Sequence, residues 1–193
     1  SFVMQYTKAA TYSVKLSANN GGCISSGTQK IIVFDKPIPD FTKQSGNCDY
    51  EKIVFVNNTT AGGSNYGSTW NFDDNGKTSV DKNPTYSFSS AGTKNIKLVV
   101  LSEFGCKDSI TKKIGIKESP KVSFTNTQFC AISKTDFSNT TPAVFGTAAN
   151  PLWDFSDGNT NTSDNVSYKW PTTGKRTISL TVTLDNGCVA KLS

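Results

Sequence analysis

The sequence contains no histidine and only one methionine among its 193 residues. Without histidine the chain cannot build a Ser-His or Cys-His nucleophilic centre. There is also no C-x-x-C motif, so the usual ligand sets of zinc are missing. Paired carboxylates occur only in short turn motifs, whereas a glycosidase needs its pair in a deep cleft. These absences predict that the protein is not an enzyme and has no cofactor.

Long apolar runs, long helix-forming stretches and clusters of basic residues are missing as well. No apolar segment is long enough to cross a bilayer, so we expect no membrane insertion. The formal net charge is +5, but no run of Lys or Arg exceeds two residues, and nucleic-acid binding needs a concentrated basic face. We therefore expect no nucleic acid among the partners.

The regular segments that remain are short and rich in Thr, Val, Ile and aromatic residues. Such residues suit pleated, half-buried strands, and turn-forming Gly, Asn and Asp separate the segments at even spacing. The apolar content of 35% is low for one thick core. The sequence therefore predicts an all-β fold of small antiparallel β-sandwiches.

The chain repeats itself with a period of about 83 residues. Trp70 recurs as Trp153, Phe41 recurs as Phe124, and the segment after Gly92 recurs after Gly174. A period of this length is the size of one autonomous sandwich rather than of a solenoid unit. We predict three repeats: the C-terminal part of a first repeat at 1–36, a second repeat at 37–117, and a third at 118–193 with a truncated last strand.

The predicted joints between repeats are short and marked by proline. Pro37-Ile38-Pro39 opens the second repeat and Ser119-Pro120 opens the third. Proline restricts the backbone, so such linkers limit bending between repeats. We expect an extended array in which each repeat meets only its neighbours.

The five cysteines fall into two series when the repeats are aligned. Cys48 and Cys130 are early in their repeats, and Cys23, Cys106 and Cys188 are late. The economical pairing is within each repeat, as Cys48–Cys106 and Cys130–Cys188, which leaves Cys23 with a partner outside the chain. The rival pairings, Cys23–Cys48 and Cys106–Cys130, would link neighbouring repeats. Either way, disulfides predict an oxidising, extracellular setting.

The Trp-centred segments carry the strongest candidates for a structural or a ligand-binding role. Period-two spacing places Trp70, Phe72, Trp153 and Phe155 in the core, although tryptophans can also serve as sugar-stacking platforms. The acidic residues beside them are expected to cap turns, although their oxygens could also ligate calcium. The residues in question are Asp73, Asp74, Asp154 and Asp157.

Trp153-Asp154-Phe155-Ser156-Asp157-Gly158 resembles the W-D-F-G-D-G signature of PKD (polycystic kidney disease-like) domains. Thr85-Tyr86 and the alternating strands after Gly92 and Gly174 resemble later parts of the same family pattern. The resemblance implies tandem immunoglobulin-like sandwiches of about seven strands. The sequence departs from the pattern where Ser156 and Asp74 replace a Gly and Asn71 replaces an Asp.

The tandem arrangement and the last-strand segment Cys106-Lys107-Asp108-Ser109 further resemble the PKD-repeat adhesins of gliding, type IX-secreting Bacteroidetes, of the SprB type. This resemblance implies a non-catalytic spacer, filament or adhesive segment of a long secreted protein at the bacterial cell surface. The implied partners are neighbouring repeats, surface polysaccharide or other cell-surface proteins.

Two other functions remain open at this point. The chain could be a carbohydrate- or protein-binding accessory module of a secreted hydrolase, which would need an exposed aromatic strip. The candidates for that strip are Tyr50, Tyr66, Phe104 and Phe145. Alternatively, edge strands could drive self-association into fibres.

Overall fold

The computed structural model describes residues 3–63, 65–127, 133–143 and 149–193 of the chain. All regular elements in these residues are β-strands, paired into sheets. The all-β prediction is therefore confirmed. The chain divides into two compact units. Unit 1 comprises 1–44, 54–85 and 95–113, and unit 2 comprises 45–53, 86–94 and 114–193.

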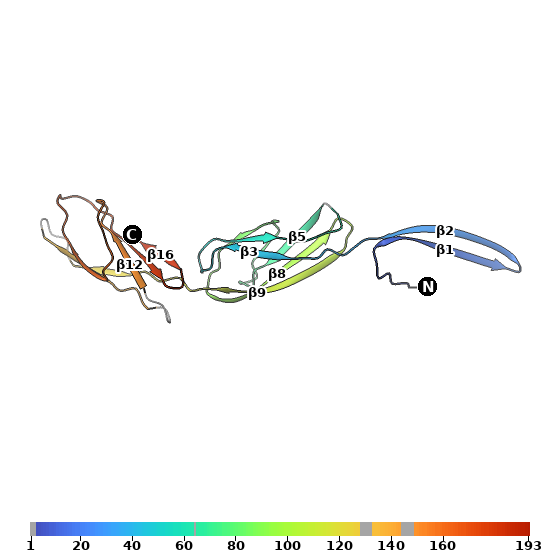
Figure 1. Ribbon diagram of the computed structural model, residues 1–193, viewed down its shortest axis with the longest axis horizontal. Coiled ribbons are helices and arrows are strands. Elements are labelled where there is room, and N and C mark those ends of the chain that lie inside the picture. The colour runs from blue at the N-terminus through green and yellow to red at the C-terminus, as the bar shows by residue number, and fades with distance from the viewer. Residues whose placement is uncertain (1–2, 64, 128–132, 144–148) are drawn as a thin grey trace. The chain divides into compact units, whose positions relative to one another are not determined.

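The N-terminal part of the chain is one long hairpin, drawn in blue in Figure 1. Strand β1 (Ala10–Asn20) pairs antiparallel with β2 (Cys23–Val33), from Ala10 opposite Val33 to Asn20 opposite Cys23. Gly21 and Gly22 make the turn with positive φ values of 57° and 99°, which glycine adopts without steric cost. These two strands form a sheet of their own.

The middle of the chain forms two sheets. A three-stranded sheet has the order β3-β4-β7, and a four-stranded sheet has the order β6-β5-β8-β9. Strand β5 pairs antiparallel with β8, with Trp70 opposite Leu98. The strands are β3 (Phe41–Ser45), β4 (Ile53–Asn57), β5 (Tyr66–Asn71), β6 (Thr78–Ser79), β7 (Thr85–Tyr86), β8 (Gly92–Ser102) and β9 (Lys107–Ile116).

The C-terminal part repeats this pattern. A three-stranded sheet has the order β10-β11-β14, and a four-stranded sheet has the order β13-β12-β15-β16. Trp153 lies opposite Leu180 in the pairing of β12 with β15, as Trp70 lies opposite Leu98. The strands are β10 (Phe124–Asn126), β11 (Thr135–Asn139), β12 (Ala149–Asp154), β13 (Thr160–Asn161), β14 (Asn165–Tyr168), β15 (Ser179–Leu184) and β16 (Val189–Leu192).

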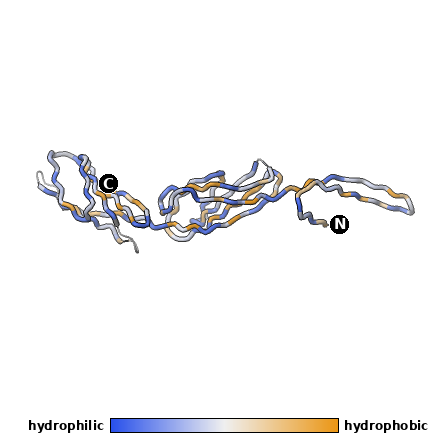
Figure 2. The backbone as a smooth tube through the Cα atoms, in the orientation of Figure 1, coloured by the Kyte–Doolittle hydropathy of each residue, from blue (hydrophilic) through white to orange (hydrophobic). Residues whose placement is uncertain are grey.

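Hydropathy alternates along many of these strands, as the tube in Figure 2 shows. In β8 the alternation buries Ile96, Leu98 and Val100 completely, while the residues between them are more exposed. Side chains of successive strand residues point to opposite faces, so in each of the two sandwiches one face of a sheet becomes the core. Trp70, Phe72, Trp153 and Phe155 all lie in these cores, at most 1% exposed.

Two non-glycine residues, each two positions beyond the end of a Trp-centred strand, adopt a left-handed backbone. Asp73 has a φ of 54° and Ser156 a φ of 62°, a region in which glycine is strongly favoured. The family signature that this segment resembles has its first Gly at this position. The sequence alignment placed that departure at Asp74, and the structure moves it to Asp73.

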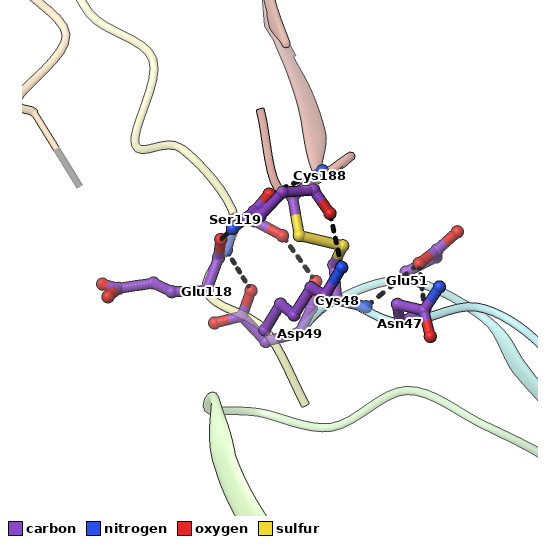
Figure 3. Close-up of a disulfide and its surroundings, with 9 residues drawn as sticks. Asn47, Cys48, Asp49, Glu51, Glu118, Ser119 and Cys188 are labelled. Carbon is purple, nitrogen blue, oxygen red and sulfur yellow. Dashed lines mark hydrogen bonds between the residues drawn. A yellow bond between two sulfur atoms is a disulfide. The ribbon is translucent and has the colours of Figure 1, made fainter. Parts of the chain in front are cut away.

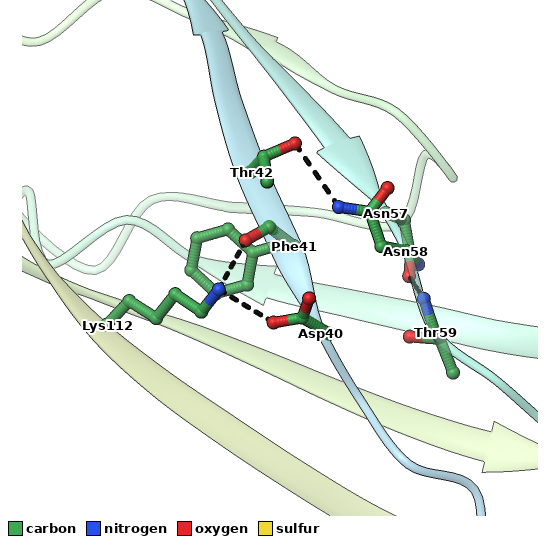
Figure 4. A network of polar contacts seen from close by, with 7 residues as sticks. All are labelled: Asp40, Phe41, Thr42, Asn57, Asn58, Thr59 and Lys112. Atoms are coloured by element: carbon green, nitrogen blue, oxygen red, sulfur yellow. Dashed lines mark hydrogen bonds and ion pairs between the residues drawn. The ribbon is translucent and has the colours of Figure 1, made fainter.

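A polar cluster in the second repeat joins β9 to the start of β3 (Figure 4). Lys112 of β9 donates a hydrogen bond of 2.6 Å to the Phe41 carbonyl and forms an ion pair of 2.6 Å with Asp40. Its Nζ lies 5.1 Å from the centre of the Phe41 ring. The hydrogen bond from Lys112 and its positive charge hold the pKa of Asp40 below the ordinary value of 3.8.

Candidate functional site: a disulfide-bonded loop, link and turn

Three segments of unit 2 converge on one disulfide: the loop 47–51, the link 117–119 and the turn 184–188 (Figure 3). The loop is shaped locally by Glu51, whose carboxylate accepts hydrogen bonds from the N–H groups of Asn47 at 2.8 Å and Cys48 at 3.1 Å. Gly46 enters the loop with a φ of 77°, and a Cβ there would lie 2.7 Å from the Ile53 side chain. Only glycine fits this entry.

The link is hydrogen-bonded to the loop on both sides of Lys117. Lys117 N–H donates to the Asn47 carbonyl at 2.8 Å, and Asp49 N–H donates to the Lys117 carbonyl at 2.9 Å. Ser119, two residues after Lys117, also bonds to the loop. Its N–H donates to the Asp49 carboxylate at 2.7 Å, and its hydroxyl donates to the Asp49 carbonyl at 2.9 Å. Asp49 is only 7% exposed, so this buried carboxylate is satisfied by the link itself.

The turn is the tight connection between β15 and β16, with Gly187 at a φ of 88°. Leu184 N–H donates to the Cys188 carbonyl, and Gly187 N–H donates to the Leu184 carbonyl, at 2.9 and 2.8 Å. The turn is bonded to the link as well. Lys117 Nζ donates to the Asn186 carbonyl at 2.6 Å, and Asn186 Nδ2 donates to the Glu118 carbonyl at 3.4 Å.

The disulfide joins Cys48 of the loop to Cys188 of the turn, with 5.8 Å between the Cα atoms. Both cysteines are almost completely buried, at 5% and 0% exposure, and belong to the core cluster around Trp153. Cys106 and Cys23 are free. The predicted pair Cys48–Cys106 is therefore wrong. Cys188 is bonded to Cys48 rather than to Cys130, and Cys130 itself lies outside the described residues.

The length of β9 explains why the within-repeat pairing fails. Cys106 directly precedes this ten-residue strand, while Cys48 forms a parallel bridge with Lys117, directly after its end. At about 3.3 Å per residue, a strand of that length separates its ends by roughly 30 Å. A disulfide requires Cα atoms within about 7 Å. The early and late cysteines of one repeat thus lie at opposite ends of one strand.

The rival pairings fail in the structure as well. Cys23–Cys48 is excluded by the bond between Cys48 and Cys188, and Cys23 is an exposed free thiol at the start of β2. Cys106 is a free, partly buried thiol. Sequence reasoning identified the two cysteine series but missed the pairing of an early cysteine with the late cysteine of the next repeat.

The two Trp-centred turns use their acidic residues in local hydrogen bonds. Asn71 Oδ1 accepts from Asp73 N–H, and Asp154 Oδ1 accepts from Ser156 N–H, both at 2.9 Å. Asp73 Oδ2 also accepts from the backbone and side chain of Asn95. Among the described residues, no group of three or more His, Cys, Asp and Glu side chains is placed to hold a metal ion. Calcium binding remains a sequence prediction that the structure does not test.

Asp157 and Tyr168 of the C-terminal sandwich are joined by a side-chain hydrogen bond. The Tyr168 hydroxyl donates to Asp157 Oδ2 at 2.7 Å. This hydrogen bond lowers the pKa of Asp157 below its ordinary value of 3.8 and raises the pKa of Tyr168 above its ordinary value of 10.0. The carboxylate is thus held in its charged form, which suits a fixed turn rather than a group that exchanges protons near neutral pH.

The aromatic candidates for a ligand-binding strip fall on different elements. Tyr50 is 72% exposed in the loop 47–51, with a left-handed φ of 60°. Tyr66 is the first residue of β5. Phe104 lies in the turn between β8 and β9, and its ring stacks on that of Phe34 with 3.7 Å between the ring centres. Phe145 lies outside the described residues. A pocket of about 290 Å³ beside the disulfide is lined by Tyr50.

The described residues contain no helix that is long and apolar enough to cross a membrane. The sequence matches the family model described as "PKD domain" twice, over residues 35–117 and 117–193. No curated protein has a sequence that matches this chain.

Three solved structures are similar in part. The PKD1 domain of Vibrio anguillarum Epp is 18% identical with a TM-score of 0.40, covering 45% of this chain and 99% of that one. The PKD1 domain of the Vibrio cholerae metalloprotease PrtV is 24% identical with a TM-score of 0.39, covering 43% and 99%. A structure from work on carbohydrate-binding modules of the β-sandwich superfamily is 16% identical with a TM-score of 0.41, covering 83% and 84%.

Proposed function

The chain belongs to the PKD domain family, and on that premise we propose that it is a non-catalytic, load-bearing segment of a long secreted repeat protein at the bacterial cell surface. In this role the repeats act as a spacer or filament that carries an adhesive region elsewhere in the protein. The resemblance of the repeats to gliding-motility adhesins supports an adhesin as the parent. The buried disulfide supports an oxidising, extracellular location.

The observation that carries this proposal is the sequence separation of 140 residues between the bonded cysteines. The covalent loop begins at Cys48 in the first matched segment of the chain and ends at Cys188 near the close of the second. A force applied to the two chain ends passes through the sulfur–sulfur bond, so the residues inside the loop cannot be drawn out. A spacer under tension would thereby keep its length even if a sandwich inside the loop unfolded.

Single-molecule pulling on the 193-residue chain tests this role. With the disulfide intact, only the residues outside the loop can extend. Reduction should release the loop and add about 490 Å of contour length, at roughly 3.5 Å for each of its 140 residues. The matched control is Cys48→Ser, which should behave like the reduced chain with or without reductant. An oxidised chain that extends to its full contour length would overturn the proposal.

A second candidate function is a carbohydrate- or protein-binding accessory module, and the exposed ring of Tyr50 at the edge of the 290 Å³ pocket favours it. Non-glycine residues with positive φ are uncommon and cluster at functional sites. If a sugar stacks there, a glycan array should show binding that Tyr50→Ala abolishes and Tyr50→Phe retains. Tyr66→Ala serves as the control, because Tyr66 does not line this pocket. Equal binding by all variants, or none by the parent chain, would remove this alternative.

A further inference from the structure

The turn that holds Cys106 has the same geometry as the turn that holds the bonded Cys188. Ser102 N–H donates to the Cys106 carbonyl at 2.8 Å, as Leu184 N–H donates to the Cys188 carbonyl at 2.9 Å. The glycine before each cysteine has a positive φ, of 81° at Gly105 and 88° at Gly187. The free thiol of Cys106 therefore lies in the same kind of turn as Cys188, which is bonded to Cys48.

The link beside Cys106 also has its counterpart in the bonded copy. Cys106 Sγ lies 3.9 Å from the carbonyl oxygen of Phe34, and Phe34 directly follows β2 as Lys117 directly follows β9. At Lys117 the backbone N–H and carbonyl are bonded to the cysteine loop. At Phe34, the described part of the chain supplies no such backbone partner. Two of the three converging segments are thus in place at Cys106.

The hairpin of β1 and β2 points to the source of the third segment. Its sequence corresponds to β8 and β9, yet the face that carries Val14, Leu16 and Ile31 is uncovered. These side chains are 39%, 76% and 39% exposed, whereas Ile96 and Leu98 of β8 are fully buried. A strand pair with an uncovered apolar face lacks the opposite sheet of its sandwich. In the complete repeat of this chain, that opposite sheet is β3-β4-β7, and the cysteine loop follows its first strand.

We propose that Cys106 forms a disulfide with a cysteine in a loop like 47–51, located early in the repeat whose last two strands are β1 and β2. The general rule would be that the early cysteine of each repeat bonds the late cysteine of the next. This deepens the proposed function, on which it rests, because it makes the covalent link a property of every joint. Each bond forms when two thiols pass two protons and two electrons to a disulfide oxidant, which is reduced to two thiols.

Under this rule the covalent loops of successive joints overlap. The observed loop runs from Cys48 to Cys188. The loop that ends at Cys106 would close before the observed loop does, and one that begins at Cys130 would start before the observed loop ends. Every stretch of chain would then lie inside at least one loop. Unfolding of a repeat would add little length to the array, because the bonds carry the load past it.

Disulfide mapping of the parent polypeptide, purified from its native source, tests the rule. Free thiols are first blocked with iodoacetamide without reductant, and the protein is then digested with trypsin. The sequence places each cysteine in its own tryptic peptide: Cys23 in 16–30, Cys48 in 44–52, Cys106 in 98–107, Cys130 in 122–134 and Cys188 in 177–191. The internal control is the bonded pair of peptides 44–52 and 177–191.

The expected result is that peptide 98–107 is linked to a peptide from further upstream that aligns with 44–52. Three results would overturn the rule: Cys106 blocked as a free thiol, Cys106 linked to Cys23 or Cys130, or Cys106 linked to a second polypeptide. In the parent protein, Cys106→Ser should also leave one additional blocked thiol, in that upstream loop. No additional blocked thiol would count against the rule.

The two proposals fail in different ways. If the mapping contradicts the rule but the 193-residue chain still shows the added contour length on reduction, the load-bearing role stands for one joint only. If the mapping supports the rule but the oxidised chain extends fully under force, the disulfides are present without bearing load.

Discussion

The second and third repeats build nearly the same aromatic core from different neighbouring sequence. The distance between ring centres is 5.1 Å for Phe41 and Trp70 and 5.3 Å for Phe124 and Trp153. The indole N–H of each tryptophan donates to a backbone carbonyl at 2.9 Å, that of Asp81 in one repeat and that of Ser163 in the other. A core of interlocking aromatic rings is therefore a property of the repeat itself.

The two repeats differ in how the first core phenylalanine is covered. Lys112 of β9 lies over the Phe41 ring, and Phe41 is fully buried. Phe124, at the same place in the third repeat, is half-buried. The cysteines differ as well, because Cys188 is bonded and Cys106 is not. The comparison teaches that the core is specified within a repeat, whereas its cover depends on single residues such as Lys112 and its covalent bonds depend on other repeats.

The largest effect is expected from the disulfide. Closing a loop of 140 residues stabilises the folded chain by about 5 kcal/mol in the chain-entropy model. Cys188→Ser should therefore lower the free energy of unfolding, measured with urea under oxidising conditions, by up to about that amount. Cys106→Ser is the matched control, since it changes the same turn position without breaking a bond. Equal losses for the two variants would show that the turn, and not the bond, stabilises the chain.

The next largest effect is expected from the two tryptophans. Removing a fully buried Trp side chain costs about 3–5 kcal/mol, and both Trp70 and Trp153 are 0% exposed. Trp70→Ala and Trp153→Ala should thus reduce the hydrogen-exchange protection of β5 and β12, respectively, by similar free energies. Val80→Ala, at a position that is 77% exposed, should change neither. A large difference between the two tryptophan variants would break the equivalence of the cores.

Much of this fold can be predicted from the sequence, because the determining signals are local. Period-two alternation in Ile96, Leu98 and Val100 identifies the core face of β8, and the recurrence of the Trp-centred segment identifies the repeat. Turn residues such as Gly187 mark where strands end. Each of these signals is complete within one repeat, so no knowledge of the rest of the chain is needed.

The disulfide could not be predicted in the same way, because it depends on where the ends of β9 lie. Alignment of the repeats shows that each has an early and a late cysteine, but it carries no distance between them. The ten-residue length of β9 supplies that distance. The predicted strand from Cys106 to the link could have supplied it, because a strand rises about 3.3 Å per residue. A strand of that length keeps Cys106 too far from any cysteine near the link for a disulfide.

A smaller effect should distinguish the covers of the two cores. Lys112→Ala removes the cation over Phe41, which is worth about 0.5–1 kcal/mol, and should leave the Phe41 ring half-buried, as Phe124 is. Lys112→Met keeps an unbranched stem over the ring and loses only the charge. Thermal unfolding at pH 7 should therefore rank the parent chain above Lys112→Met and Lys112→Ala lowest.

The same cluster predicts a dependence on pH. Because the pKa of Asp40 is lowered in the folded chain, its contribution to stability is present above the ordinary value of 3.8 and is lost as the pH falls through the lowered value. The difference in stability between the parent chain and Lys112→Met should shrink over that acid range. A difference that is independent of pH would show that Lys112 acts through packing alone.

The smallest effect separates the two left-handed residues of the Trp-centred turns. Ser156 and Asp73 share a positive φ, and replacing a non-glycine residue there by glycine relieves about 1 kcal/mol of backbone strain, less the cost of a more flexible unfolded chain. Ser156→Gly should therefore stabilise the third repeat by about 0.5 kcal/mol in urea unfolding. Asp73→Gly should not stabilise the second repeat, because it also removes the two hydrogen bonds to Asn95, at 3.0 and 2.9 Å. If both variants gain equally, those bonds contribute nothing, and the two turns are equivalent despite their different residues.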